Sequence, residues 1–142
     1  MNKVLKKFLE QAPHREVISP KQAEEFYSFG FSLYGAGNFK EAADVFEVLS
    51  VQWPLNAKHW FALGSARQEN KEYEKALHAW AMTAILNSED PYSHFHAAEC
   101  CLSLAKHEDA ALALQAASVR AKENVDLQKK ITLLKQQWSL DK

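Results

Sequence analysis

Small and bulky apolar residues recur along the chain at a fixed interval of 34 residues. In each copy a small residue is followed twelve positions later by alanine, and four positions after that by a bulky apolar residue. Such a period indicates a repeat protein, in which stacked units bury an apolar face that one unit cannot bury alone. The register places the units at residues 23–56, 57–90 and 91–124, with landmarks at Gly30, Gly64 and Ala98, then Ala42, Ala76 and Ala110, and then Phe46, Trp80 and Leu114.

Each unit is predicted to form two helices that pack as a hairpin. The small residue lies in the middle of the first helix, where glycine is less favourable than alanine by about 1 kcal/mol. We therefore expect the second helix to approach closely at this point. In the first unit, Ala42 is expected to supply the small surface that faces Gly30, and Phe46 to fill the space one turn later.

Local signals mark the starts of several helices. The string SPKQ, which begins at Ser19, offers a serine N-cap, a proline at the first helical position and a glutamine for a capping box. Asn38 with Glu41 predicts a similar cap for the second helix of the first unit. Asp90, directly before a proline, is expected to open the third unit.

Both ends of the chain carry further helical patterns. In segment 125–142 the apolar residues follow a helical spacing, which predicts a helix that caps the third repeat. In segment 1–19 a second stripe predicts a short helix before Pro13, which could cap the repeats, lie free of them or pair with another subunit. The C-terminal stripe consists of Leu127, Ile131, Leu134 and Trp138, and the N-terminal stripe of Val4, Leu5, Phe8, Leu9 and Ala12.

The repeat resembles the tetratricopeptide repeat, a 34-residue helix–turn–helix unit with large, small and proline landmarks. The second unit has Ser88 at the proline position, and the third has His107 where the other two have an aromatic residue. The resemblance implies an all-α fold in one domain, residues 1–142. It would consist of three tandem repeats in a short right-handed solenoid, with an N-terminal helical segment and a C-terminal capping helix.

Composition and charge narrow the class of protein. Hydrophobic residues make up 47% and charged residues 25% of the chain, which is typical of a globular domain. No apolar run approaches the roughly 18 residues of a membrane span, and no signal peptide is recognisable, so we expect a cytoplasmic protein. Residues 21–117 hold seven basic and thirteen acidic side chains, which argues against binding to nucleic acid.

An aromatic stripe in the first unit exceeds what the repeat pattern needs. Tyr27, Phe31 and Tyr34 lie on one face of the first helix, and the first helices of stacked hairpins line the concave side of a solenoid. Two interpretations remain open, namely core packing against the N-terminal segment or an apolar groove for a peptide. We favour the groove. The matching positions in the other units are Phe61, Ser65 and Gln68, and Phe95, Glu99 and Leu102.

The sequence predicts neither a metal site nor an enzyme. His96 and Cys100 could share a helical face, but two ligands are too few for structural zinc. The adjacent Cys100 and Cys101 fit reduced packing residues. The chain contains no nucleophile elbow, phosphate-binding glycine loop or His-Glu-x-x-His motif, so no cofactor is expected.

Two strings are more specific than the generic repeat. HWFALGSARQ, from His59, and FHAAEC, from Phe95, resemble the chaperones of translocator proteins in bacterial type III secretion systems. The similarity covers about residues 20–117. It implies a non-enzymatic cytoplasmic chaperone that holds a hydrophobic pore-forming translocator by an extended segment with spaced proline and leucine anchors. By motif position, the resemblance and the repeat register imply client-binding residues at Tyr27, Phe31, Tyr34, Phe61, Ala62, Ser65, Phe95, His96 and Glu99.

The client and the oligomeric state stay open at this point. A chaperone of a needle subunit or an effector in the same system is an alternative. A generic tetratricopeptide adaptor for C-terminal carboxylates is another, but it needs Lys, Arg or Asn where this chain has mainly aromatic and small residues. Members of the family often dimerise through the N-terminal helical region, and the segment before the first unit is short here. No membrane insertion is expected.

Overall fold

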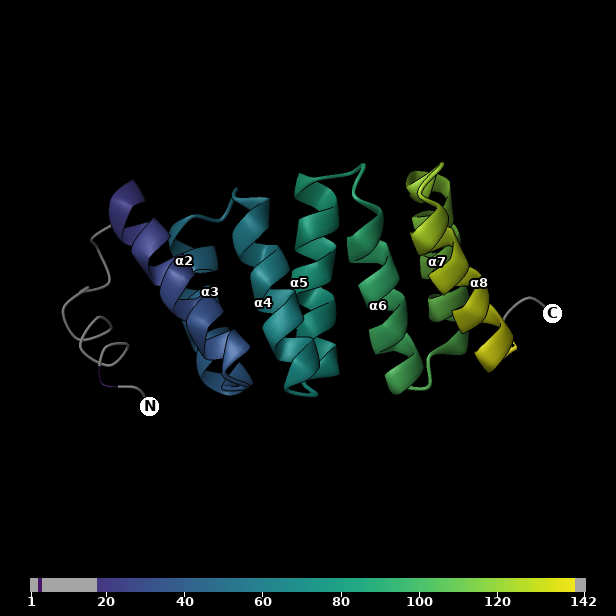
Figure 1. Cartoon of the computed structure of the whole chain (residues 1–142), viewed down its shortest axis with the longest axis horizontal. Helices are drawn as coiled ribbons and strands as arrows, with labels where there is room; N and C mark the ends of the chain where they lie inside the picture. The colour runs from purple at the N-terminus through teal and green to yellow at the C-terminus, as the bar shows by residue number, and fades with distance from the viewer. Residues whose placement is uncertain (1–2, 4–17, 140–142) are drawn as a thin grey trace.

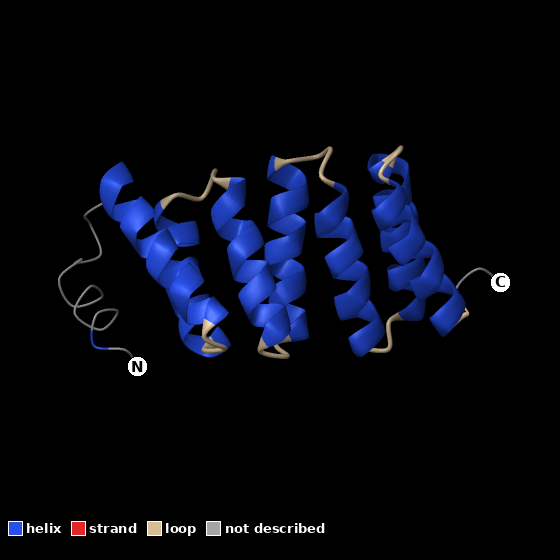
Figure 2. Ribbon diagram, viewed as in Figure 1, coloured by secondary structure: helices blue, strands red, loops and turns tan. Residues whose placement is uncertain are grey.

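A computed structural model describes residue 3 and residues 18–139 of the chain. All regular elements among these residues are helices (Figures 1 and 2). The helix predicted before Pro13 lies outside the described residues. The helices are α2 (Pro20–Gly35), α3 (Phe39–Gln52), α4 (Ala57–Glu69), α5 (Tyr73–Leu86), α6 (Pro91–Ser103), α7 (His107–Ala121) and α8 (Val125–Trp138).

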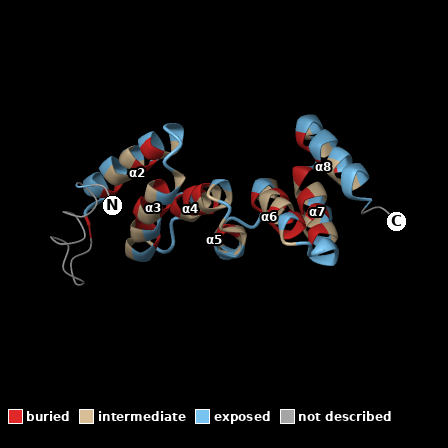
Figure 3. Cartoon of the chain, turned by 90° about the horizontal axis from the view of Figure 1, so that it is seen from below, coloured by how far each residue is buried: buried red, intermediate tan, exposed pale blue. Residues whose placement is uncertain are grey.

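The helices form a row of hairpins that runs from α2 at one end to α8 at the other, with α3 partly behind α2 and α7 partly behind α8 in this view (Figure 1). Each helix packs against the next along the chain, and short loops join them into hairpins. Buried residues run along the middle of the row, whereas exposed residues cover the outer sides of the helices (Figure 3). This arrangement confirms the predicted all-α tetratricopeptide fold.

The helix starts follow the predicted signals in two of three cases. The Ser19 hydroxyl accepts a hydrogen bond from the Gln22 backbone N–H at 3.2 Å, and the Ser19 N–H donates to the Gln22 side chain at 2.9 Å, which completes the capping box. The Asp90 carboxylate accepts from the Tyr92 N–H at 2.9 Å. The cap predicted at Asn38 is wrong, because its side chain makes no capping bond. Its ψ of 66° lies outside the extended region from which such a side chain reaches the first turn.

Replacing Ser19 with alanine should lower the free energy of unfolding by about 1 kcal/mol, since the α2 cap is then lost. Urea denaturation followed by circular dichroism measures the change. Ser88→Ala is the matched control, because this exposed serine makes no side-chain hydrogen bond among the described residues. The control should stay within about 0.5 kcal/mol of the wild type. Equal losses in the two variants would contradict the cap.

The nearest neighbour of Gly30 in the hairpin is an aromatic ring. A Cβ at this position would lie 2.6 Å from Cε1 of Phe46, so the glycine faces this ring. A Cβ at Gly64 would likewise lie 2.9 Å from the Trp80 ring. In the third repeat, Ala98 takes the place of the glycine and Leu114 takes the place of the aromatic residue. Both are fully buried. The glycine therefore makes room for a ring.

Helix α8 closes the C-terminal end of the solenoid. Leu127 and Ile131 are almost fully buried in one cluster with Leu114 of α7. The fourth residue of the predicted stripe, Trp138, remains 44% exposed, and its ring centroid lies 5.8 Å from that of His107. The apolar face of α8 thus covers the third repeat mainly through its first two turns.

Candidate functional site

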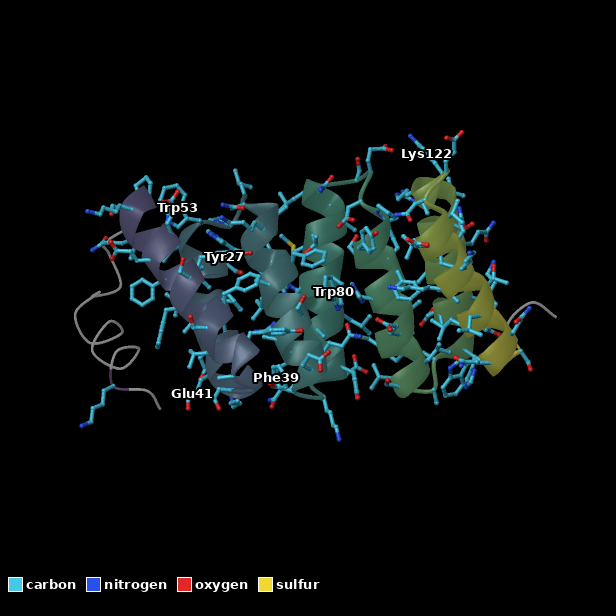
Figure 4. All side chains as sticks on the ribbon, in the orientation of Figure 1. Tyr27, Phe39, Glu41, Trp53, Trp80 and Lys122 are labelled. Carbon is cyan, nitrogen blue, oxygen red and sulfur yellow. The ribbon has the colours of Figure 1, made fainter. Side chains whose placement is uncertain are left out.

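A hollow of about 240 Å³ opens between α2 and α4. It is lined by all the residues predicted for a client site in the first two repeats. A buried aromatic ring from α3 also lines it. The lining residues are Tyr27, Phe31, Tyr34, Phe46, Phe61, Ala62 and Ser65. Figure 4 shows Tyr27 between the ribbons of α2 and α4. The repeat register thus brings residues from three helices to one apolar depression.

The aromatic stripe of α2 belongs partly to the core and partly to the surface. The Tyr27 ring centroid lies 5.2 Å from Phe31, 5.8 Å from Phe46 and 6.0 Å from His59. Phe46 is buried, whereas Phe31 is 55% exposed. The Lys58 ammonium lies 4.2 Å from the Tyr27 centroid, a cation–π contact at the rim. The stripe therefore offers a firmly packed base with one exposed ring beside it.

Both tyrosine hydroxyls of the hollow keep their protons at neutral pH. Burial raises the pKa of Tyr27 above its usual value. Burial also raises the pKa of Tyr34, and the nearby Glu69 carboxylate adds to that effect. Protonated phenols can donate a hydrogen bond to a peptide carbonyl while their rings contact apolar atoms. The hollow is thus suited to a peptide whose apolar side chain contacts the rings while its backbone carbonyl accepts a hydrogen bond from a phenol.

The aromatic surface continues from α4 towards α6. The Phe61 ring meets the Trp80 ring edge to face with 4.9 Å between centroids, and the His96 ring stacks on Trp80, also at 4.9 Å. Phe61 and His96 are 6.1 Å apart. His96 is thereby fixed on the repeat that precedes it. The first hollow and the third repeat are joined by three rings in contact.

A hydrogen-bonded series of side chains borders these rings. The Trp80 indole N–H donates to Gln68 at 3.0 Å, and the Gln68 amide donates to Glu99 Oε1 at 3.1 Å. His96 Nδ1 meets the same Glu99 oxygen at 2.7 Å. His96 and Glu99 were predicted site residues, whereas Trp80 was expected only to pack between helices. Its link to Gln68 could not be read from spacing, because it depends on the orientation of two side chains from different helices.

Phe95 is packed beneath this surface, with its ring centroid 5.5 Å from that of His96, and its client contact stays a prediction. The side chain is only 7% exposed and lies in the cluster of α6, α7 and α8 with Leu114 and Leu127. The equivalent residues of the first two repeats, Tyr27 and Phe61, border the hollow. In the third repeat the next helix is the capping helix, which contributes Leu127 to the cluster and encloses the ring.

The two cysteines are buried free thiols. Burial, followed by the charge of Glu99, raises the pKa of Cys100 to about 12, so this thiol stays protonated at neutral pH. Within the described part of the chain, no three His, Cys, Asp or Glu side chains come together as a metal site would require. Nor does any described helix have the length and apolar character needed to cross a membrane.

Comparison with known proteins agrees with this geometry. A family model described as tetratricopeptide repeat matches residues 27–94. The low calcium response locus protein H of Yersinia pestis is 35% identical over 85 residues, which are 60% of this chain and 51% of that protein. The chain therefore matches about half the length of this curated relative.

Two solved structures are similar along most of the chain. A chain of the CopN–Scc3 complex has 30% sequence identity and a TM-score of 0.79, and the match covers 94% of this chain and 87% of that one. The Yersinia enterocolitica type III secretion chaperone SycD, solved with a peptide of the translocator YopD, has 26% identity and a TM-score of 0.82, with 89% and 98% covered. These likenesses and the repeat register lead to one assignment: the chain belongs to the tetratricopeptide-repeat family of type III secretion translocator chaperones.

Proposed function

We propose that this chain is a non-enzymatic chaperone of the bacterial cytoplasm that binds a hydrophobic translocator protein before its secretion. It grips an extended client segment in a groove formed by Tyr27, Phe31, Tyr34, Phe61, Ala62, Ser65, His96 and Glu99. The observation that carries the proposal is the hollow between α2 and α4, where aromatic rings remain accessible around a depression of about 240 Å³. The SycD structure, which holds a YopD peptide, supports it by similarity.

The hollow suits an anchor residue of an otherwise unfolded client. Phe46 forms a buried base, and Phe31 exposes an apolar ring beside it. A leucine or proline side chain could enter here and lose its contact with water, which is favourable by about 25 cal/mol per Å² of apolar surface. Because the groove is formed by packed helices, little ordering free energy is lost on the chaperone side when a client binds.

The same surface does not suit an adaptor for C-terminal carboxylates. Such an adaptor needs several donors that converge on the anion. Lys58 reaches the rim, but its ammonium lies over the Tyr27 ring. Arg67 pairs with Glu47 at 3.2 Å. The polar side chains towards the third repeat include Glu99, a carboxylate, which would repel an anion.

The proposal is tested by expressing each hydrophobic translocator encoded near this gene, with and without the chain. Without the chain, we expect the translocator to sediment on ultracentrifugation. With it, the translocator should remain in the supernatant and co-purify with the chain. If the translocators still sediment while a needle subunit or an effector co-purifies, the client class is wrong. Homodimer formation by the N-terminal segment, most of which lies outside the described residues, can be measured on the same samples by light scattering.

A further inference from the structure

The orientation of the Gln68 amide is fixed by its neighbour. The Trp80 indole nitrogen can only donate a hydrogen bond, so the atom of Gln68 that it meets at 3.0 Å must be the carbonyl oxygen. The amide nitrogen of Gln68 then points to Glu99 Oε1, 3.1 Å away, and donates to it. Trp80 is 1% exposed and cannot turn freely. Gln68 is thus held as a donor towards Glu99.

The position of the proton on His96 follows from its contact with Glu99. The ionised carboxylate of Glu99 only accepts, so the 2.7 Å contact requires a proton on Nδ1 of His96. One oxygen of Glu99 thereby receives two hydrogen bonds. No hydrogen bond from any described residue reaches the other oxygen. The Glu99 side chain is 36% exposed, so an incoming group can reach it from solvent.

The charge around Glu99 is not neutralised by nearby lysine or arginine. In the described part of the chain, Arg67 forms its ion pair with Glu47, and Lys106 with Glu74. Lys58 lies over the Tyr27 ring at the first hollow. The second oxygen of this carboxylate can accept a charge-assisted hydrogen bond, which is stronger than one from a neutral donor.

We propose that Glu99 binds a lysine or arginine side chain of the client and so determines client specificity, with Gln68 as a positioning residue. The inference rests on the proposed function and adds to it the chemistry of a second subsite. Phe61 connects the two subsites, because it lines the hollow and its ring lies 6.1 Å from that of His96. A client segment should therefore carry an apolar anchor and, a short fixed distance along the chain, a basic residue.

The test is selection from a random peptide display library, performed in parallel on the wild type, Glu99→Gln and Glu89→Gln. Glu89 is exposed in the loop between α5 and α6, outside the groove. Glu89→Gln is therefore a control that removes the same charge as Glu99→Gln without changing the groove. Peptides selected by the wild type and by Glu89→Gln should share apolar anchors and a basic residue at a fixed offset. Peptides selected by Glu99→Gln should keep the anchors and lose the basic residue.

The affinity of one selected peptide for each variant measures how much Glu99 contributes to binding. Glu99→Gln should weaken binding by up to about fivefold, the range for a partly exposed ion pair, and Glu89→Gln should not weaken it. Changing the basic residue of the peptide to glutamine should remove the difference between wild type and Glu99→Gln. If Glu99→Gln weakens binding while the wild type shows no preference for basic residues, the subsite takes a main-chain amide and the proposal is wrong.

The positioning role of Gln68 needs a separate measurement. In Gln68→Ala, Glu99 loses the donor that holds its carboxylate beside His96. The ¹⁵N chemical shifts of His96 should therefore show a smaller fraction of the Nδ1–H form, and the preference for the basic residue should weaken. A variant that only melts earlier, with unchanged shifts and preference, would overturn the positioning role. If wild-type peptides show no apolar anchors, the proposed function itself fails. If they show anchors without a basic residue, only this inference fails.

Discussion

Gly30→Ala is expected to destabilise the protein by about 1–3 kcal/mol, although alanine is the better helix former. The new Cβ would lie 2.6 Å from Cε1 and 2.8 Å from Cζ of Phe46, well inside van der Waals contact. The Phe46 ring is 1% exposed and packs against Tyr27, so it cannot move aside without disturbing the base of the hollow. The free energy of unfolding from urea denaturation measures the effect.

Two further variants test whether the contact with the Phe46 ring causes the loss of stability in Gly30→Ala. Gly35→Ala lies near the end of the same helix and meets no atom within 4 Å, so it should be neutral or slightly stabilising. Phe46→Leu in the Gly30→Ala background should recover part of the lost stability, because the third repeat already pairs alanine with leucine at Ala98 and Leu114. A double-mutant cycle should give a favourable coupling of about 1 kcal/mol. Additive losses would show that the ring contact is not the cause.

The repeat register was predictable because it rests on local chemistry. A 34-residue period with fixed small and bulky positions determines which helices pair and which faces meet. Gly30 and Gly64 were correctly placed at close helix contacts, but spacing alone could not identify the partner. Ala42 and Phe46 both lie on the facing helix, and only the three-dimensional packing shows that the glycine accommodates the ring of Phe46.

The candidate site was predictable in its first two repeats and less so in the third. The hollow contains all six residues that the sequence analysis assigned to those two repeats. The burial of Phe95 was not predictable, because the repeat register treats all copies as equivalent, whereas the last copy meets a capping helix. The Trp80–Gln68–Glu99 series is a property of side-chain orientation across three helices, which no residue spacing records.

The remaining large effect concerns the exposed ring of the groove. Phe31→Ala should weaken client binding by about tenfold to a hundredfold, or about 1–3 kcal/mol, as truncation of an interface aromatic usually does. Phe31 is 55% exposed and stands beside Tyr27, so its loss should hardly change the melting temperature. The binding constant for a translocator fragment, measured by isothermal titration calorimetry, gives the result.

Ile85→Ala is the matched control for Phe31→Ala. Ile85 on α5 is 72% exposed and does not line the hollow, so its truncation removes exposed apolar surface without touching the groove. It should leave the affinity unchanged. Equal losses in the two variants would mean that general surface hydrophobicity holds the client, and an unchanged affinity in Phe31→Ala would place the binding site elsewhere.

The triple variant of Tyr27, Phe31 and Tyr34 to alanine separates the groove from the core. Tyr27 contacts both Phe46 and His59, so this variant should melt earlier than Phe31→Ala. At a temperature where the triple variant remains folded, its client affinity should fall further than that of Phe31→Ala. Apolar anchoring also predicts that raising the salt concentration changes the affinity of Glu99→Gln less than that of the wild type, since screening acts on the Glu99 ion pair and not on the rings.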